Sequence, residues 1–77
     1  MKVQVLGTGC AKCKKTEEHA RQAIAELGLD ADLVKVTDLN DILEFNVMMT
    51  PALAVDGEVK VSGRVPSVAV IKGFLTQ

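Results

Sequence analysis

Two cysteines separated by two residues constrain this chain more than any other feature of its sequence. Cys10 and Cys13 follow a short apolar stretch containing Val3 and Val5, and they precede a segment with helical periodicity. A disulfide between them would close only a very short loop, which stabilises a fold little in the chain-entropy picture. In a reducing compartment, such a close pair is typical of a redox-active or a metal-binding site.

Hydrophobic periodicity predicts alternating strands and helices along the chain. Apolar and small residues recur at intervals of three and four from Ala11 to Leu27, which predicts an amphipathic helix that ends at Gly28. Asp56-Gly57 is a strong two-residue turn between two β-rich stretches, which predicts a hairpin. In chain order, the predicted elements are a strand over 3–6, a helix over 11–27, a strand over 32–36, a short helix over 39–45 capped by Thr37-Asp38, strands over 52–55 and 59–61, and a last helix over 68–75 opened by Pro66-Ser67.

This order, β-α-β-α-β-β-α, predicts an α/β fold. Strands joined through helices imply parallel pairing, and the late hairpin adds an antiparallel edge. We therefore expect a four-stranded mixed sheet flanked by helices. The chain shows no repeat or linker, and its 77 residues are expected to form a single domain, 1–77.

Composition and charge exclude two classes of partner. The net charge is −1, from nine basic and ten acidic residues, whereas a nucleic-acid binder needs a concentrated basic surface, and the absence of Trp and Tyr removes stacking platforms. The start of the chain lacks the apolar run of a secretory signal, and no stretch approaches the roughly 20 apolar residues of a membrane span. We expect a cytoplasmic monomer with no nucleic-acid or membrane partner.

The position of the cysteines at the start of a predicted helix gives each thiol a role. Cys10 lies near unpaired backbone N–H groups and the positive end of the helix dipole, both of which favour its thiolate. Lys12 adds positive charge nearby, although solvent screens it. At positions i and i+3, the two sulfurs can bond without a large backbone change. We predict that Cys10 is the nucleophile, with a pKa lowered in part by Lys12, and that Cys13 is the resolving thiol.

A proline directly before a predicted strand makes this pattern more specific. Pro51 has no N–H to pair, and an X–Pro bond is the one context in which a cis peptide costs little; the alternative is a trans proline that only begins the strand. With the cysteines upstream, the pattern resembles the thioredoxin superfamily, in which a cis-proline loop faces the C-x-x-C. The resemblance implies that Thr50 and Pro51 bind an extended substrate segment, and that the bond between them is cis.

The whole chain is similar to the small archaeal and bacterial redox-active disulfide proteins, which are thioredoxin- and glutaredoxin-like domains. This resemblance implies exchange with protein disulfides, no bound cofactor, and a thioredoxin-reductase-like flavoprotein as electron donor. It also makes Gly63 a substrate-groove candidate. Gly9 replaces the Trp of Trp-Cys-Gly-Pro-Cys, so redox potential and substrate choice do not carry over. The resemblance rests on Gly7-Thr8-Gly9-Cys10-Ala11-Lys12-Cys13, Lys35-Val36-Thr37-Asp38, Thr50-Pro51-Ala52-Leu53, Asp56-Gly57 and Ser62-Gly63-Arg64-Val65-Pro66.

Two other classes of protein use the same residues. Gly-x-x-Cys-x-x-Cys after a first strand resembles heavy-metal-associated domains, and two thiolates suit Cu(I) or Zn(II). However, Thr8 stands where that family usually has Met, and its order β-α-β-β-α-β ends in a strand rather than a helix. The third class is an interaction domain that keeps the thioredoxin fold without catalysis, against which the two retained cysteines argue.

Three further residues have both a structural and a functional interpretation. We expect His19 to be a solvated helix residue, with tuning of the cysteine pair as the alternative. Met48 and Met49 directly precede Thr50. They form either an apolar rim for docking partners, since Met adapts to varied surfaces, or part of the core.

Overall fold

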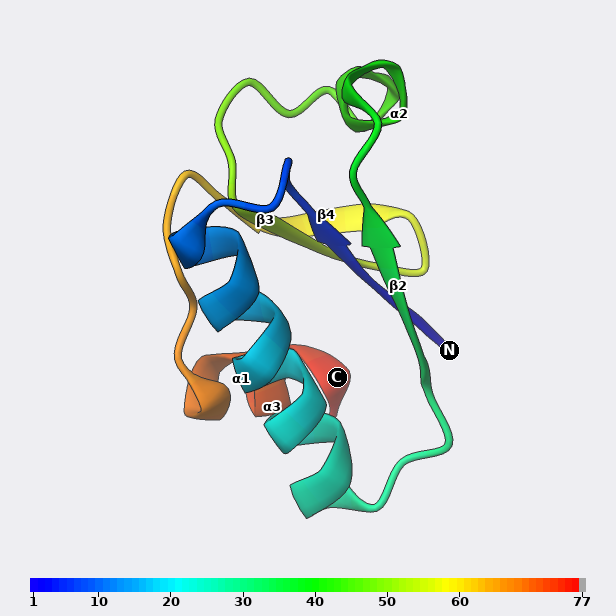
Figure 1. Cartoon of the computed structure of the whole chain (residues 1–77). Helices are drawn as coiled ribbons and strands as arrows, with labels where there is room; N and C mark the ends of the chain where they lie inside the picture. Colours follow the sequence, from blue (N-terminus) through cyan, green and yellow to red (C-terminus); the bar gives the residue numbers. More distant parts are fainter. Residues whose placement is uncertain (77) are drawn as a thin grey trace.

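In the computed structural model, which describes residues 1–76, four strands and three helices follow the predicted order (Figure 1). Among these residues, no helix combines the length and the apolar character that crossing a membrane requires. The elements are β1 (Lys2–Leu6), α1 (Ala11–Leu27), β2 (Asp32–Val36), α2 (Leu39–Glu44), β3 (Ala52–Val55), β4 (Glu58–Ser62) and α3 (Val68–Leu75).

The sheet has the strand order β2-β1-β3-β4 and is mixed, as predicted. β1 and β2 pair in parallel, and β3 and β4 form the expected antiparallel hairpin. One expectation is wrong: β3 follows a helix, yet it pairs antiparallel to β1. The reason is the length of α2, whose six residues rise only about 9 Å and do not return the chain to the far end of the sheet.

This short crossover has a direct consequence for the position of Pro51. β2 ends at Val36, beside Leu6, and β3 begins at Ala52, which also pairs with Leu6. The residues immediately before β3 therefore lie at the same end of the sheet as the turn that leads from β1 into α1. The two sequence motifs, which are some 40 residues apart, meet at this end.

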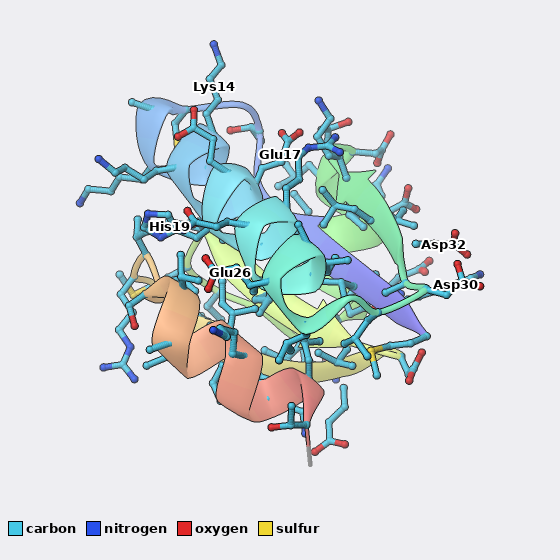
Figure 2. The ribbon with its side chains drawn as sticks, turned by 90° about the horizontal axis from the view of Figure 1, so that it is seen from below. Lys14, Glu17, His19, Glu26, Asp30 and Asp32 are labelled. Carbon is cyan, nitrogen blue, oxygen red and sulfur yellow. The ribbon has the colours of Figure 1, made fainter. Side chains whose placement is uncertain are left out.

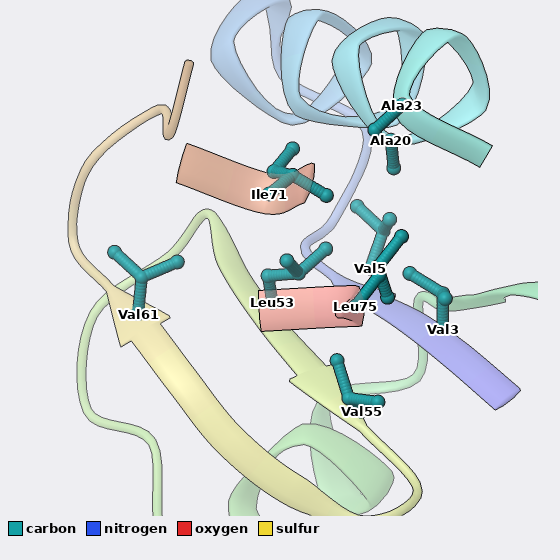
Figure 3. Packing of buried hydrophobic residues seen from close by; sticks show 9 residues of the cluster. All are labelled: Val3, Val5, Ala20, Ala23, Leu53, Val55, Val61, Ile71 and Leu75. Atoms are coloured by element: carbon teal, nitrogen blue, oxygen red, sulfur yellow. The ribbon is translucent and has the colours of Figure 1, made fainter. Parts of the chain in front are cut away.

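Each face of the sheet has its own apolar core. The residues of one cluster come from alternate strand positions together with α1 and α3, whereas the other cluster includes Ile42 of α2. Figure 3 shows the α1 and α3 side chains facing those of the strands. The larger cluster consists of Val3, Val5, Ala20, Ala23, Leu53, Val55, Val61, Ile71 and Leu75, and the smaller one of Leu6, Ile42, Val47, Ala52 and Ala54.

The helices begin where the sequence predicts them, and α1 and α3 also end there, whereas α2 ends at Glu44, one residue earlier than predicted. Gly28 closes α1 in the left-handed region, with φ of 64°, which glycine adopts without a steric cost. Asp38 caps α2 by accepting hydrogen bonds from backbone N–H groups of its first turn, and Ser67 caps α3 in the same way. α1 is capped by Cys10, whose sulfur accepts from the Cys13 N–H. The nucleophile predicted from the sequence is thus also the helix cap.

The packing of α3 against the larger core can be tested with two neighbouring residues. Ile71 is 0 % exposed and Val70 is 44 % exposed. Ile71→Ala should lower the free energy of unfolding by about 2–5 kcal/mol, because it leaves a cavity in the core. Val70→Ala, the control, should change it by less than about 0.5 kcal/mol. Urea unfolding measures both values, and equal losses in the two variants would contradict this packing.

Candidate active site

The two cysteines lie against each other at the N-terminus of α1. Cys10 is exposed and Cys13 is buried, and both are free thiols. Their Sγ atoms are 2.8 Å apart and share a hydrogen bond, and the Cys13 backbone N–H points at Cys10 Sγ, 3.4 Å away. A disulfide bond is about 2.05 Å long, so the pair can be oxidised with a movement of less than about 1 Å.

The surroundings of the two sulfurs shift their pKa values in opposite directions. The pKa of Cys10 is lowered, first by the hydrogen bond from the Cys13 side chain and then by the Cys13 backbone N–H. Lys12 contributes to the lower pKa of Cys10 through its backbone N–H. Burial raises the pKa of the Cys13 thiol, and its hydrogen bond to Cys10 raises it further. Of the two sulfurs, the exposed one therefore loses its proton more readily than the buried one.

Gly7 is a site residue that the sequence did not single out for the chemistry. It follows β1, and its N–H donates to Val36 O at 3.0 Å. A Cβ at this position would overlap with Cys13 Sγ and lie 3.0 Å from Cys13 Cβ. Only a residue without a side chain lets the buried thiol pack so closely against the end of β1. The only signal in the sequence is a glycine that ends the strand shortly before the cysteines.

The bond between Thr50 and Pro51 is cis, which confirms that prediction. Pro51 is buried at the start of β3, and Thr50 is exposed. The Thr50 Cβ lies 4.0 Å from the point that a Cβ on Gly7 would occupy, next to Cys13 Sγ. The structure therefore brings Thr50 and Pro51 to the cysteine pair, as the resemblance implied.

Gly63 joins this group from the end of β4. Its N–H donates to Pro51 O at 2.9 Å, and its φ of 78° lies in the left-handed region. A Cβ on Gly63 would lie 3.3 Å from Met49 Cβ, so the backbone here passes very close to the segment that precedes the cis-proline. Gly63 thus lies directly beside the segment that contains Thr50 and Pro51.

A small pocket of about 80 Å³ opens beside the buried thiol. Glu17, one turn along α1 from Cys13, contributes a carboxylate that pairs with Arg21 at 3.0 Å and with Lys35 at 3.6 Å. These cations lower the pKa of Glu17, so its carboxylate is ionised. Figure 2 shows Glu17 on α1, beside β2. The pocket is lined by Val5, Gly7, Gly9, Cys13, Lys14, Glu17, Lys35 and Thr37.

The structure also distinguishes between the structural and functional interpretations of Met48, Met49 and His19. Met48 and Met49 are 97 % and 65 % exposed, so the interpretation as core residues is wrong, and they lie on the surface beside Thr50. The expectation that His19 is simply solvated is also wrong. Its ring is half-buried, and Nδ1 lies 2.8 Å from Pro66 O, 47 residues along the chain.

A dithiol that caps the first helix of a mixed sheet, beside a cis-proline, defines the class of thioredoxin-fold dithiol domains. The model of the thioredoxin domain family matches residues 1–76. The chain is 49 % identical over 76 residues to a thioredoxin of Methanothermobacter thermautotrophicus, covering 99 % of both chains. It is 47 % identical over 70 residues to a thioredoxin of Methanocaldococcus jannaschii, covering 91 % of this chain and 80 % of that one. The chain belongs to the thioredoxin domain family. This membership supports the assignment of a thiol–disulfide oxidoreductase function.

The hydrogen bond between the sulfurs leads to a prediction about the acidity of Cys10. Cys13→Ala removes a donor that stabilises the thiolate, so the pKa of Cys10 should rise toward the ordinary cysteine value of about 8.5. The pH dependence of the rate at which iodoacetamide alkylates Cys10 measures this shift. Cys13→Ser keeps a donor and should give a smaller rise. An unchanged midpoint in Cys13→Ala would contradict the assignment.

The close packing of Gly7 leads to a second prediction for this site. Gly7→Ala should destabilise the reduced protein by about 1–3 kcal/mol, because the methyl group displaces the Cys13 thiol, and it should slow disulfide formation. Gly73→Ala is the control, since a Cβ there meets no atom within 4 Å, and Ala stabilises a helix interior by about 0.5–1 kcal/mol relative to Gly. Urea unfolding and the rate of oxidation by a small disulfide measure both effects.

Proposed function

We propose that residues 1–77 act as one cytoplasmic domain that exchanges its Cys10–Cys13 dithiol and disulfide with disulfides of partner proteins. The observation that carries the proposal is the asymmetry of the pair: an exposed sulfur with a lowered pKa, 2.8 Å from a buried sulfur with a raised one. An exposed thiolate is the attacking group that disulfide exchange needs, and a neighbouring thiol can complete the reaction.

The exchange takes place in two steps. The Cys10 thiolate attacks one sulfur of the partner disulfide, so a bond forms between Cys10 and the partner while the partner's own S–S bond breaks and its leaving thiolate takes up a proton. Cys13 then loses its proton and attacks Cys10 Sγ, which forms the Cys10–Cys13 disulfide and releases the second partner thiolate. Two electrons pass to the partner, and a reductant restores the dithiol.

The second step requires the removal of a proton from a buried thiol. The pocket beside Cys13 has room for two or three water molecules, at about 30 Å³ each, and is bordered by the ionised carboxylate of Glu17. Water in this pocket can carry the Cys13 proton to the solvent, past the ionised carboxylate. Lys35 holds the carboxylate in place beside the pocket.

The partner's disulfide approaches along the wall formed by Thr50, Pro51 and Gly63. Thr50 is exposed, and its backbone lies just before β3, where an extended segment of the partner can pair with it. The exposed Met48 and Met49 extend this wall with an adaptable apolar surface. The backbone N–H of Lys12 supports the thiolate that faces the wall.

The electron donor is proposed to be a thioredoxin-reductase-like flavoprotein, in keeping with the family. No bound cofactor is needed, since the two sulfurs store the electrons themselves, and the protein is proposed to work as a monomer.

Soft-metal carriage remains the alternative role of the dithiol. Reduction of insulin disulfides and anaerobic Cu(I) titration separate the two roles, because a carrier would bind copper tightly without reducing insulin.

The two-step scheme predicts different outcomes for the two cysteines. Cys10→Ser should abolish the reduction of insulin disulfides, because no attacking thiolate remains. Cys13→Ser should form a mixed disulfide that accumulates, because the resolving thiol is missing. Non-reducing electrophoresis and mass spectrometry of the adduct measure this. If Cys13→Ser forms no adduct while the wild type is active, the proposed order of the two thiols is wrong.

A further inference from the structure

The wall formed by Thr50, Pro51 and Gly63 is also linked to α1, through a contact that the exchange chemistry does not use. Residues 63–66 connect β4 to α3, and Pro66 at their end contacts His19, which lies midway along α1. At one end of this connection, the Gly63 N–H is bonded to Pro51 O. At the other end, Pro66 is buried directly before Ser67, which caps α3. The connection therefore borders the groove through Gly63 and anchors the last helix through Pro66.

His19 links this connection to the helix that carries the two thiols. Its Nδ1 lies 2.8 Å from Pro66 O, and Figure 2 shows the ring on the side of α1 that faces the start of α3. A carbonyl oxygen can only accept a hydrogen bond, so Nδ1 must carry the hydrogen. His19 lies six residues beyond Cys13, about 9 Å along the helix axis, so it acts at a distance from the sulfurs.

An exposed ion pair also joins α1 and α3, but it differs from the His19 contact in strength and position. Lys72 of α3 and Glu26 of α1 form an ion pair at 2.8 Å, and both side chains are more than a third exposed. Solvent and salt weaken such a pair. It also lies near the opposite ends of both helices, far along the chain from the residues that border the groove. The His19 bond is half-buried and lies next to the connection itself.

We propose that His19 is a positioning residue for the substrate groove: by donating from Nδ1 to Pro66 O, it fixes residues 63–66, and with them Gly63, at a set distance from the thiols on α1. This inference rests on the proposed exchange with protein disulfides. Without the bond, the connection can move away from α1, and the wall that Gly63 forms with Met49 and Pro51 loses its position. Large partners use this wall, whereas a small disulfide needs only the exposed Cys10 sulfur.

The test compares large and small disulfides in two variants of His19. His19→Leu fills the space without a donor, and His19→Asn places an amide N–H at about the reach of Nδ1. His19→Leu should raise KM for insulin about 3- to 10-fold, the effect of one neutral hydrogen bond, with kcat and the rate with 5,5′-dithiobis(2-nitrobenzoic acid) changed less than about twofold. His19→Asn should restore most of the affinity. Glu18→Gln, on the exposed neighbouring residue, should behave as the wild type.

Three results would overturn the inference. They are an unchanged KM in a folded His19→Leu variant, an equal loss with both disulfides, and a failure of His19→Asn to recover more than His19→Leu does. A fourth measurement needs no variant: ¹⁵N NMR of the neutral imidazole should show the hydrogen on Nδ1, and a hydrogen on Nε2 would exclude the bond. An inactive wild type with insulin would instead reject the proposed function, while the NMR result would still report on the contact.

Discussion

The hydrogen bond between the two sulfurs is the interaction on which the rest of the site depends. It lowers the pKa of the exposed Cys10 and adds to the effect of burial in raising the pKa of Cys13, so it helps to define which thiol attacks and which one resolves. The contact exists because the Cys10 sulfur also caps α1, which places the next turn of the helix directly beneath it. Helix formation and thiol activation are therefore two effects of the same local geometry.

The close approach of the sulfurs also requires space behind them. The end of β1 supplies it through Gly7, where the chain passes so near Cys13 that no side chain fits. On the other side, α2 is too short to return the chain to the far end of the sheet, and Pro51 therefore enters β3 beside the dithiol. A longer crossover would return the chain to the far end and separate the two motifs. The site thus depends on a strand end, a helix start and the length of one connection.

Much of the fold and part of the site could be predicted from the sequence. The element order, the hairpin turn and the helix caps depend on local signals such as Gly28 and Asp56-Gly57, and the structure confirms them. The cis bond before Pro51 and its place near the cysteines followed from the family resemblance. The direction of β3 was not predictable by the rule that a helix joins parallel strands, because that rule assumes a helix long enough to span the sheet.

The sequence by itself determined the two thiols, their order along a helix, the helix caps and the hairpin turn, because these depend on neighbours within one or two turns of chain. Only the tertiary structure decided that the Gly7 backbone packs against Cys13, that Glu17 borders the pocket beside Cys13, and that His19 meets Pro66 O. These contacts join residues from different elements, some of them 47 positions apart, so they depend on how the helices settle on the sheet. Local periodicity contains no information about that packing.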